Sequence, residues 1–114
     1  MSRVKVNNSG LSKAHSLIKS RHYVLDSDWS DAQASERAES DWLEKHNWGA
    51  YGEWHLAVDA DANEETKEHY KFPFGDFQRV HRSALIAAKQ RAAQNHYTAI
   101  EEAADELLTE LDRK

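Results

Sequence analysis

The chain has 114 residues, a net charge of −5 and no cysteine, and its length suits a single domain over residues 1–114. These properties exclude a disulfide framework, a thiolate metal site and a cysteine nucleophile, and no apolar run reaches the roughly 18 residues of a membrane helix. The N-terminus lacks the continuous apolar segment of a secretory signal. We therefore expect a cytoplasmic protein with no membrane partner.

The aliphatic inventory is thin, because Leu, Ile, Val and Phe together supply 20 of the 114 residues. Four Trp, four Tyr and sixteen Ala compensate, since aromatic rings bury large areas and alanine lets helices approach closely. The sequence therefore predicts a folded domain with a small aromatic core. Such a core is easily extended across a symmetric interface, so we expect self-association, most simply as a homodimer.

Charge is unevenly distributed along the chain. Residues 1–25 carry five basic side chains and no acidic one, whereas residues 26–68 have a net charge of −10. Residues 69–96 return to +4, and residues 97–114 fall to −4. We interpret these blocks as basic helices lying against acidic ones, with a basic patch that faces a partner as the alternative.

The N-terminal part of the chain predicts a short strand and two helices. The strand is expected at Arg3–Val6, within a segment, 1–8, that could equally be a flexible arm. Ser9 is expected to cap a helix that continues to about Arg21. The second helix is expected from Ser30-x-x-Gln33, which fits a capping box, to about residues 46–47.

The middle of the chain changes to a period of two, which indicates strands. In GEWHLAVD, the residues Trp54, Leu56 and Val58 occupy alternate positions and predict a half-buried strand. In HYKFPF the aromatic residues alternate, but Pro73 cannot donate to a strand pair, so this segment is expected at a sheet edge. The two segments are expected to pair as an antiparallel hairpin across the polar loop 59–68.

The C-terminal part predicts two antiparallel helices. Gly75 supplies a hinge and Asp76 an N-cap for a helix over about 77–94, which is apolar around much of its circumference and therefore central. Thr98-x-x-Glu101 fits a capping box for a last helix with one apolar stripe, and the short connection 95–97 makes the two helices neighbours. The stripe consists of Ile100, Ala103, Ala104, Leu107, Leu108 and Leu111. The predicted fold class is α+β and mostly helical, with about four helices and one small antiparallel β-hairpin.

No metal site and no cofactor is predicted. DADANEETKEHY starts like a calcium loop, but it has Glu64 and Tyr70 at the positions where calcium needs a glycine and a bidentate glutamate. None of the seven histidines has the spacing that brings two imidazoles to one ion, so surface and packing roles are expected for them.

Hydrolysis and phosphate chemistry have no recognisable motif. There is no Gly-x-Ser-x-Gly elbow, every serine stands in a cap or helix context, and the four glycines form no phosphate-binding loop. Acid–base pairs stay open, because sequence does not show which carboxylates are buried, so an enzyme of unrecognised type is one alternative and no catalytic residue is assigned.

Nucleic-acid binding is not expected. As the second helix of a helix-turn-helix, the last helix would enter the major groove, yet it carries six acidic residues that the phosphates would repel. A phosphate contact through Lys13, Lys19 and Arg21 stays open.

An aromatic group stands in the middle of the chain, where three Trp and one Tyr fall within thirteen residues. One interpretation is that these rings fill the core that the aliphatic residues leave short. The other is an aromatic platform over residues 42–54 for a small ligand or a partner protein, because Trp and Tyr are common in binding hot spots. The candidate contact residues are Trp42, Trp48, Tyr51, Trp54, His55, His81 and Arg82.

Four short segments carry a resemblance to other sequences: LAVD at 56–59, YKFPFGDF at 70–77, VHRSAL at 80–85 and RAAQ at 91–94. With them, residues from about 42 to 112 resemble small uncharacterised bacterial and phage-associated domains carried on mobile DNA. The resemblance implies an accessory protein encoded on a cassette, and it brings no activity. We therefore expect first a protein-interaction module, second a small-ligand-binding domain and third an enzyme.

Overall fold

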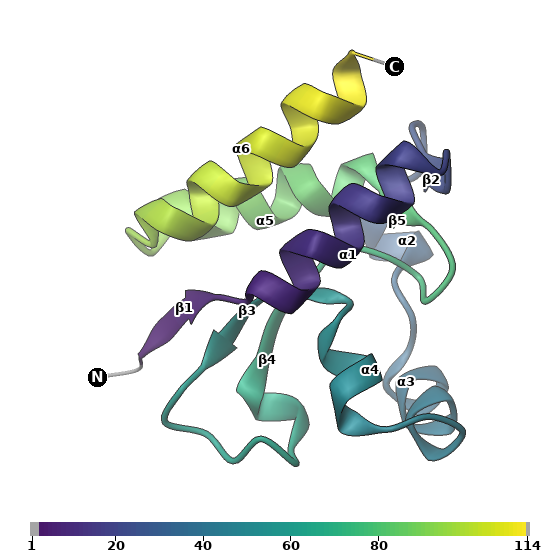
Figure 1. Cartoon of the computed structure of the whole chain (residues 1–114), viewed down its shortest axis with the longest axis vertical. Helices are drawn as coiled ribbons and strands as arrows, with labels where there is room; N and C mark the ends of the chain where they lie inside the picture. The colour runs from purple at the N-terminus through teal and green to yellow at the C-terminus, as the bar shows by residue number, and fades with distance from the viewer. Residues whose placement is uncertain (1–2, 114) are drawn as a thin grey trace.

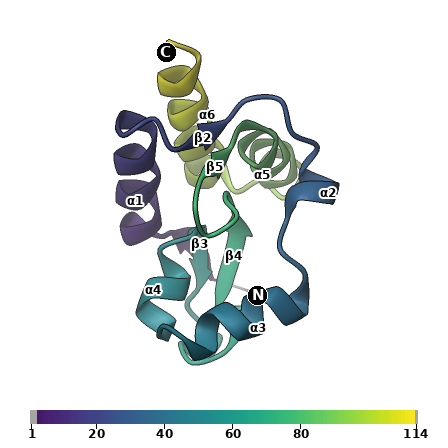
Figure 2. The same ribbon diagram turned by 90° about the vertical axis from the view of Figure 1, so that its right-hand side faces the viewer.

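A computed structural model describes residues 3–113 and has an α+β fold, as predicted. The long helices α1, α5 and α6 lie together over the sheet, and α5 packs closely along α6 (Figure 1). Figure 2 shows α3 and α4 at the opposite end of the molecule from α5 and α6. The helices are α1 (Asn8–Lys19), α2 (Trp29–Ala32), α3 (Glu36–Glu44), α4 (Trp48–Gly52), α5 (Arg82–Gln94) and α6 (Thr98–Asp112).

The main sheet is antiparallel and has the strand order β1-β3-β4. Its strands are β1 (Val4–Val6), β3 (His55–Asp59) and β4 (Tyr70–Pro73), and a short 3-10 helix, η1 (Lys67–His69), leads into β4. His55 lies opposite Pro73, so the predicted hairpin is confirmed. The N-terminal strand adds to its other side, with Val4 opposite Asp59. β4 is an edge strand of this sheet, as Pro73 predicts.

A second, parallel pairing was not predicted. β2 (Tyr23–Val24) pairs with β5 (Val80–His81), so that Val24 lies opposite His81. The prediction of a helix from residue 77, capped by Asp76, is therefore wrong, since α5 starts at Arg82. The Asp76 carboxylate accepts the N–H groups of Gln78 and Arg79 at 3.0 and 2.7 Å, and so closes a turn ahead of β5 instead.

The helix predicted from Ser30 to residues 46–47 is also divided. Asp28 accepts the N–H of Ser30 and caps α2, and Ser35 accepts the N–H of Ala38 and caps α3. The backbone between them is extended, which separates the two helices. α4 was not predicted; it starts because the Asn47 side chain accepts the N–H of Ala50 at 2.8 Å.

Two further caps differ from the prediction. Asn7 and Tyr97 are the N-cap residues of α1 and α6, in place of Ser9 and Thr98, and neither makes a side-chain cap bond. The Asn7 amide is used elsewhere, since it donates to the carbonyl of Gly52 at the end of α4 and to that of His55 at the start of β3. Tertiary packing therefore decides where these two helices begin.

The core contains aromatic side chains and the apolar side chains of the helices, as predicted. Trp54 is 5% exposed and packs with Phe74 and Leu85, and the whole predicted stripe of α6 is buried. The prediction that β3 is half-buried is wrong, because its first four residues are all buried. His55, on the face expected to meet solvent, is covered by the rings of Tyr51 and Tyr70.

The basic and acidic blocks pair with each other within the chain, as predicted, through ion pairs at the surface. The Nε of Arg82 lies 2.9 Å from a carboxylate oxygen of Asp112, and the Nζ of Lys89 lies 2.7 Å from one of Asp105. Both pairs join α5 to α6. Within residues 3–113, no helix is both long and apolar enough to cross a bilayer.

Candidate functional site

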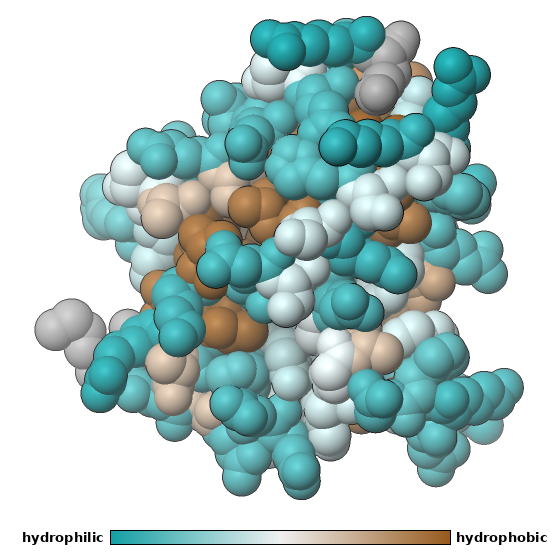
Figure 3. All heavy atoms as spheres, viewed as in Figure 1, coloured by the Kyte–Doolittle hydropathy of each residue, from teal (hydrophilic) through white to brown (hydrophobic). Residues whose placement is uncertain are grey.

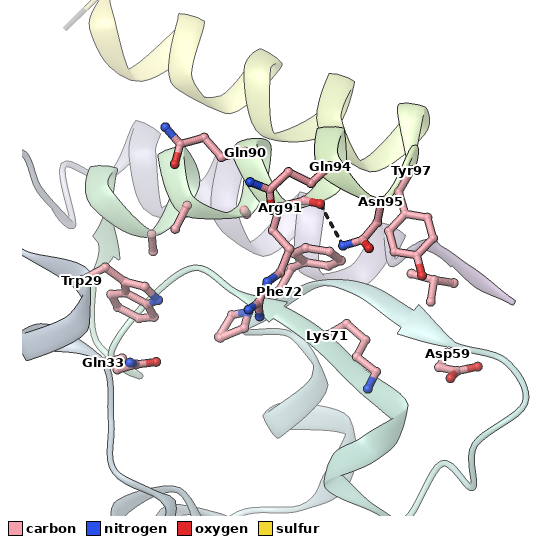
Figure 4. A pocket seen from close by; sticks show the side chains of 15 residues that line it. Trp29, Gln33, Asp59, Lys71, Phe72, Gln90, Arg91, Gln94, Asn95 and Tyr97 are labelled. Carbon is pink, nitrogen blue, oxygen red and sulfur yellow. Dashed lines mark hydrogen bonds between the residues drawn. The ribbon is translucent and has the colours of Figure 1, made fainter. Parts of the chain in front are cut away.

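A groove of about 820 Å³ runs along one side of α5, where α5 faces β4 and α2 (Figure 4). This volume falls in the range of about 300–1,000 Å³ that is usual for ligand pockets. The lining residues are Val4, Trp29, Gln33, Asp59, Lys71, Phe72, Pro73, Ala84, Ala87, Ala88, Gln90, Arg91, Gln94, Asn95 and Tyr97.

The groove exists because α5 is rich in alanine on this side. Ala84, Ala87 and Ala88 recur at helical spacing and leave room between the helix and β4. The aromatic rings of Trp29 and Phe72 supply larger apolar walls. The floor is therefore apolar, while the rim carries amide side chains.

The groove has an excess of positive charge. Lys71 and Arg91 line it from β4 and α5, its two facing walls, and Asp59 is the single carboxylate among the lining residues (Figure 4). In the described part of the chain, neither cation forms an ion pair, whereas Arg82 and Lys89 on the same helix are paired with α6. α6 thus neutralises one side of α5 and leaves the groove side positive.

At one end the groove continues into a more open hollow of about 590 Å³. Trp29, Gln33, Ala87 and Gln90 line both spaces. The hollow adds the hydroxyl groups of three serines and the apolar side chain of Ile86. Its residues beyond the shared ones are Ser27, Asp28, Ser30, Ser83 and Ile86.

His81 lies beside this hollow and is 4% exposed. Its Nδ1 is 2.7 Å from the Oγ of Ser27, and its Nε2 is 2.8 Å from a carboxylate oxygen of Asp76. Desolvation alone would raise the pKa of Asp76. Hydrogen bonds from His81 and from the N–H groups of Arg79 and Gln78 outweigh it and hold that pKa below its usual value. Asp76 is therefore ionised at neutral pH.

A second buried histidine, His55, lies next to a cavity of about 20 Å³, which has room for one water molecule. Its Nδ1 is 3.0 Å from the carbonyl oxygen of Tyr51, so this nitrogen carries the proton. Burial lowers the pKa of His55 to about 4. Glu39 also lines the cavity, and its burial raises the pKa of its carboxyl group. Burial and the nearby Glu39 likewise raise the pKa of the Tyr51 hydroxyl group.

Two residues of the predicted aromatic group are buried in the core and two are half-buried at its edge. Tyr51 and Trp54 are interior residues, at 2% and 5% exposed. Trp42 is half-buried and stacks on Phe77, with 4.5 Å between ring centroids, and Trp48 is half-buried and stacks on Tyr70 at 6.0 Å. Trp42, Tyr51 and Trp54 each contact the ring of Phe77, and Trp48 contacts Tyr51 edge-on. None of these four rings lines the groove along α5.

Arg82, the remaining candidate, points to α6. Two of its guanidinium nitrogens donate to the carboxylate of Asp112, at 2.9 and 3.3 Å. Trp29, Gln33 and Arg91, which line the groove, were not predicted. A single Trp, a Gln and an Arg on helical segments give no sequence signal that separates them from ordinary surface residues.

In the loop that starts like a calcium site, side-chain oxygens accept hydrogen bonds from backbone N–H groups of the same loop. Asp59 accepts the N–H of Asp61 at 3.0 Å, and Asn63 accepts the N–H of Glu65 at 2.8 Å. Across residues 3–113, no three His, Cys, Asp or Glu side chains are grouped to hold one metal ion.

Comparisons of the chain with family models, with curated proteins and with solved structures found no match.

Proposed function

We propose that the protein is an interaction module whose groove along α5 binds a short, extended and acidic segment of a partner protein. The observation that carries the proposal is the pair of cations, Lys71 and Arg91, that face an apolar floor without an ion-pair partner in residues 3–113. A carboxylate that enters the groove meets two positive charges and one negative charge. Opposite charge across an interface steers encounter and fixes register.

The length of the groove favours a peptide over a compact small molecule. Ala84, near the start of α5, and Asn95, the residue that follows α5, mark its two ends and are about three turns apart, or about 17 Å at 1.5 Å per residue. An extended chain covers that length with roughly five residues, at about 3.3 Å each.

The rim of the groove suits a peptide backbone. Its amide side chains each combine donors with an acceptor, which matches the alternating N–H and C=O groups of an extended chain. Trp29 and Phe72 are placed to contact apolar side chains of the bound segment. The amides are those of Gln33, Gln90, Gln94 and Asn95.

Arg91→Gln is expected to weaken binding of acidic pentapeptides about fivefold, because a partly exposed ion pair contributes about 1 kcal/mol. The probe is a library of acetylated pentapeptides with one glutamate and apolar flanking residues, measured by calorimetry and by Trp fluorescence. The same library with lysine in place of glutamate is expected to bind much more weakly.

The matched control is Arg37→Gln, which removes an equal charge from the exposed face of α3, away from the groove. It should leave the affinity unchanged at 0.15 M salt, where distant charges are screened. Equal binding of the glutamate and lysine libraries would contradict the proposal.

Self-association is the second part of the proposal, in keeping with a small accessory protein of the cytoplasm encoded on a mobile cassette. In residues 3–113 the exposed large hydrophobic side chain is Leu25, at 54%, and Figure 3 shows small apolar patches separated by polar side chains on the face it draws. A dimer would therefore bury mixed surface, which is typical of weaker interfaces. We expect a monomer–dimer equilibrium in sedimentation velocity, with a coefficient that rises over a hundredfold range of concentration. A constant monomer value would count against self-association.

A further inference from the structure

We propose that Ser27, His81 and Asp76 form a hydrolytic site for acyl esters, with Ser27 as the nucleophile, His81 as the general base and acid, and Asp76 as the residue that positions His81. The proposal does not depend on peptide binding, although the hollow shares Trp29, Gln33, Ala87 and Gln90 with the groove. It rests on a chain of short hydrogen bonds that starts at a carboxylate and ends at a hydroxyl group in an open hollow.

The hydrogen bonds fix the tautomer of His81. Asp76 is an ionised acceptor, so the Nε2 of His81, at 2.8 Å, carries a proton and donates it to the carboxylate. In the neutral imidazole, Nδ1 then has the lone pair and accepts the hydroxyl proton of Ser27 at 2.7 Å. A serine that donates to a histidine whose other nitrogen is held by a carboxylate has the arrangement of an activated nucleophile.

The fold brings these residues together from three separate segments. Pairing of β2 with β5 places Val24 opposite His81, and Ser27 follows three residues later. The turn after Gly75 holds Asp76, because its other carboxylate oxygen accepts two backbone N–H groups. The Trp29 ring packs against the His81 ring at a tilt of 48°, with 5.5 Å between centroids, and His81 is 4% exposed.

Ser27 is accessible, since it is half-buried and lines the hollow of about 590 Å³. Ile86 and Ala87 offer an apolar surface for a short acyl chain. The Oγ of Ser83 is 3.0 Å from the Oγ of Ser27, so its hydroxyl group is a donor within reach of a carbonyl oxygen on the attacked carbon.

The reaction follows from these positions. The Oγ of Ser27 bonds to the carbonyl carbon of an ester, its proton passes to Nδ1 of His81, and the π electron pair moves onto the carbonyl oxygen. When the carbonyl re-forms, the bond to the leaving alcohol breaks and that alcohol takes the proton from Nδ1. Water then attacks the acyl-serine by the same route and releases a carboxylic acid, so that ester and water become acid and alcohol.

A biotinylated fluorophosphonate tests the nucleophile directly, because it phosphonylates activated serines. We expect labelling of the wild-type chain at Ser27, located by peptide mass spectrometry, and hydrolysis of p-nitrophenyl butyrate. Ser27→Ala is expected to lose the label and at least tenfold of the turnover. Ser12→Ala, at an exposed position of α1, is the matched control and should retain both.

Asp76→Asn tests the positioning role. The amide nitrogen would donate to Nε2 of His81, so that Nδ1 would carry the proton and could no longer accept from Ser27. We expect labelling to fall tenfold or more and to recover only at alkaline pH, whereas a structural role would not move the pH profile. Absence of label from Ser27 in the wild-type chain, or turnover unchanged in Ser27→Ala, would overturn the proposal. The position of the label in the wild-type chain tests the proposal even if a variant fails to fold.

Discussion

Gly10→Ala is expected to destabilise the folded protein by about 3–5 kcal/mol, even though alanine is the better helix former by about 1 kcal/mol. Gly10 is buried in α1, where that helix crosses the start of β3. A Cβ atom at this position would lie 1.8 Å from the carbonyl oxygen of His55 and 2.8 Å from its carbonyl carbon. Backbone atoms of a central strand cannot turn aside as a side chain would, so α1 must move away from the sheet.

The movement would break more than one contact. The side-chain amide of Asn7 donates to the carbonyls of Gly52 and His55, at 2.8 and 3.0 Å, and so ties the start of α1 to α4 and β3. The added Cβ would also lie 3.1 Å from that amide nitrogen. The loss therefore combines overpacking with broken hydrogen bonds to buried carbonyls.

Urea denaturation measures the effect, with a melting temperature lower by about 10–20 °C as a second measure. Ser12→Ala, an exposed position of the same helix, is the control and should change stability by less than about 0.5 kcal/mol. If Gly10→Ala were instead stabilised by about 1 kcal/mol, helix propensity alone would govern the site and α1 would not be seated against β3.

The sequence predicts those parts of the fold that depend on local periodicity. The stripe of α6, the hairpin of β3 and β4, and the edge position of Pro73 all follow from spacing or from backbone chemistry, and the structure has them. Helix starts were predicted less well, because several acceptors compete along the chain. Asp28 and Ser35 cap two short helices where Ser30 alone suggested one long helix.

The candidate sites depend on contacts that no local pattern encodes. Ser27 and His81 are 54 positions apart and meet because of a parallel pairing of two short strands. The groove forms because the alanines of α5 face β4, which is a separate segment of the chain. Alanines at helical spacing are equally typical of a helix that packs in the core, so the sequence does not predict the groove. The aromatic group at 42–54, in contrast, can be recognised from the local sequence. Its two most buried rings, Tyr51 and Trp54, fill the interior.

Acid is expected to destabilise the protein between about pH 6.5 and pH 4 through His55. Burial lowers the pKa of this residue to about 4 in the folded chain, whereas an unfolded histidine titrates near 6.5. Below pH 6.5 the unfolded chain gains a proton that the folded chain does not bind, so the free energy of unfolding falls. Above pH 6.5 the stabilising contribution is complete. The difference of about 2.5 pH units corresponds to about 3 kcal/mol.

The groups around His55 decide how this loss is measured. Burial raises the pKa of Glu39, which lines the same cavity, so its protonation favours the folded state as pH falls and offsets part of the effect. Tyr51 and Tyr70, whose rings cover His55, have raised pKa values and do not titrate in acid. A comparison between two variants therefore isolates the histidine better than the wild-type curve alone.

His55→Asn keeps a side-chain N–H that can donate to the Tyr51 carbonyl and removes the titrating ring. The variant will be less stable at every pH because it leaves a cavity, so the informative quantity is the change in unfolding free energy between pH 7 and pH 4.5. We expect that change to be about 2 kcal/mol smaller than in the wild-type chain. His96→Asn, at an exposed position, should leave it as in the wild type. Equal changes in the wild type and in His55→Asn would mean that the folded chain protonates His55 as readily as the unfolded chain does, and that the imidazole is hydrated and not sealed between α4 and β4.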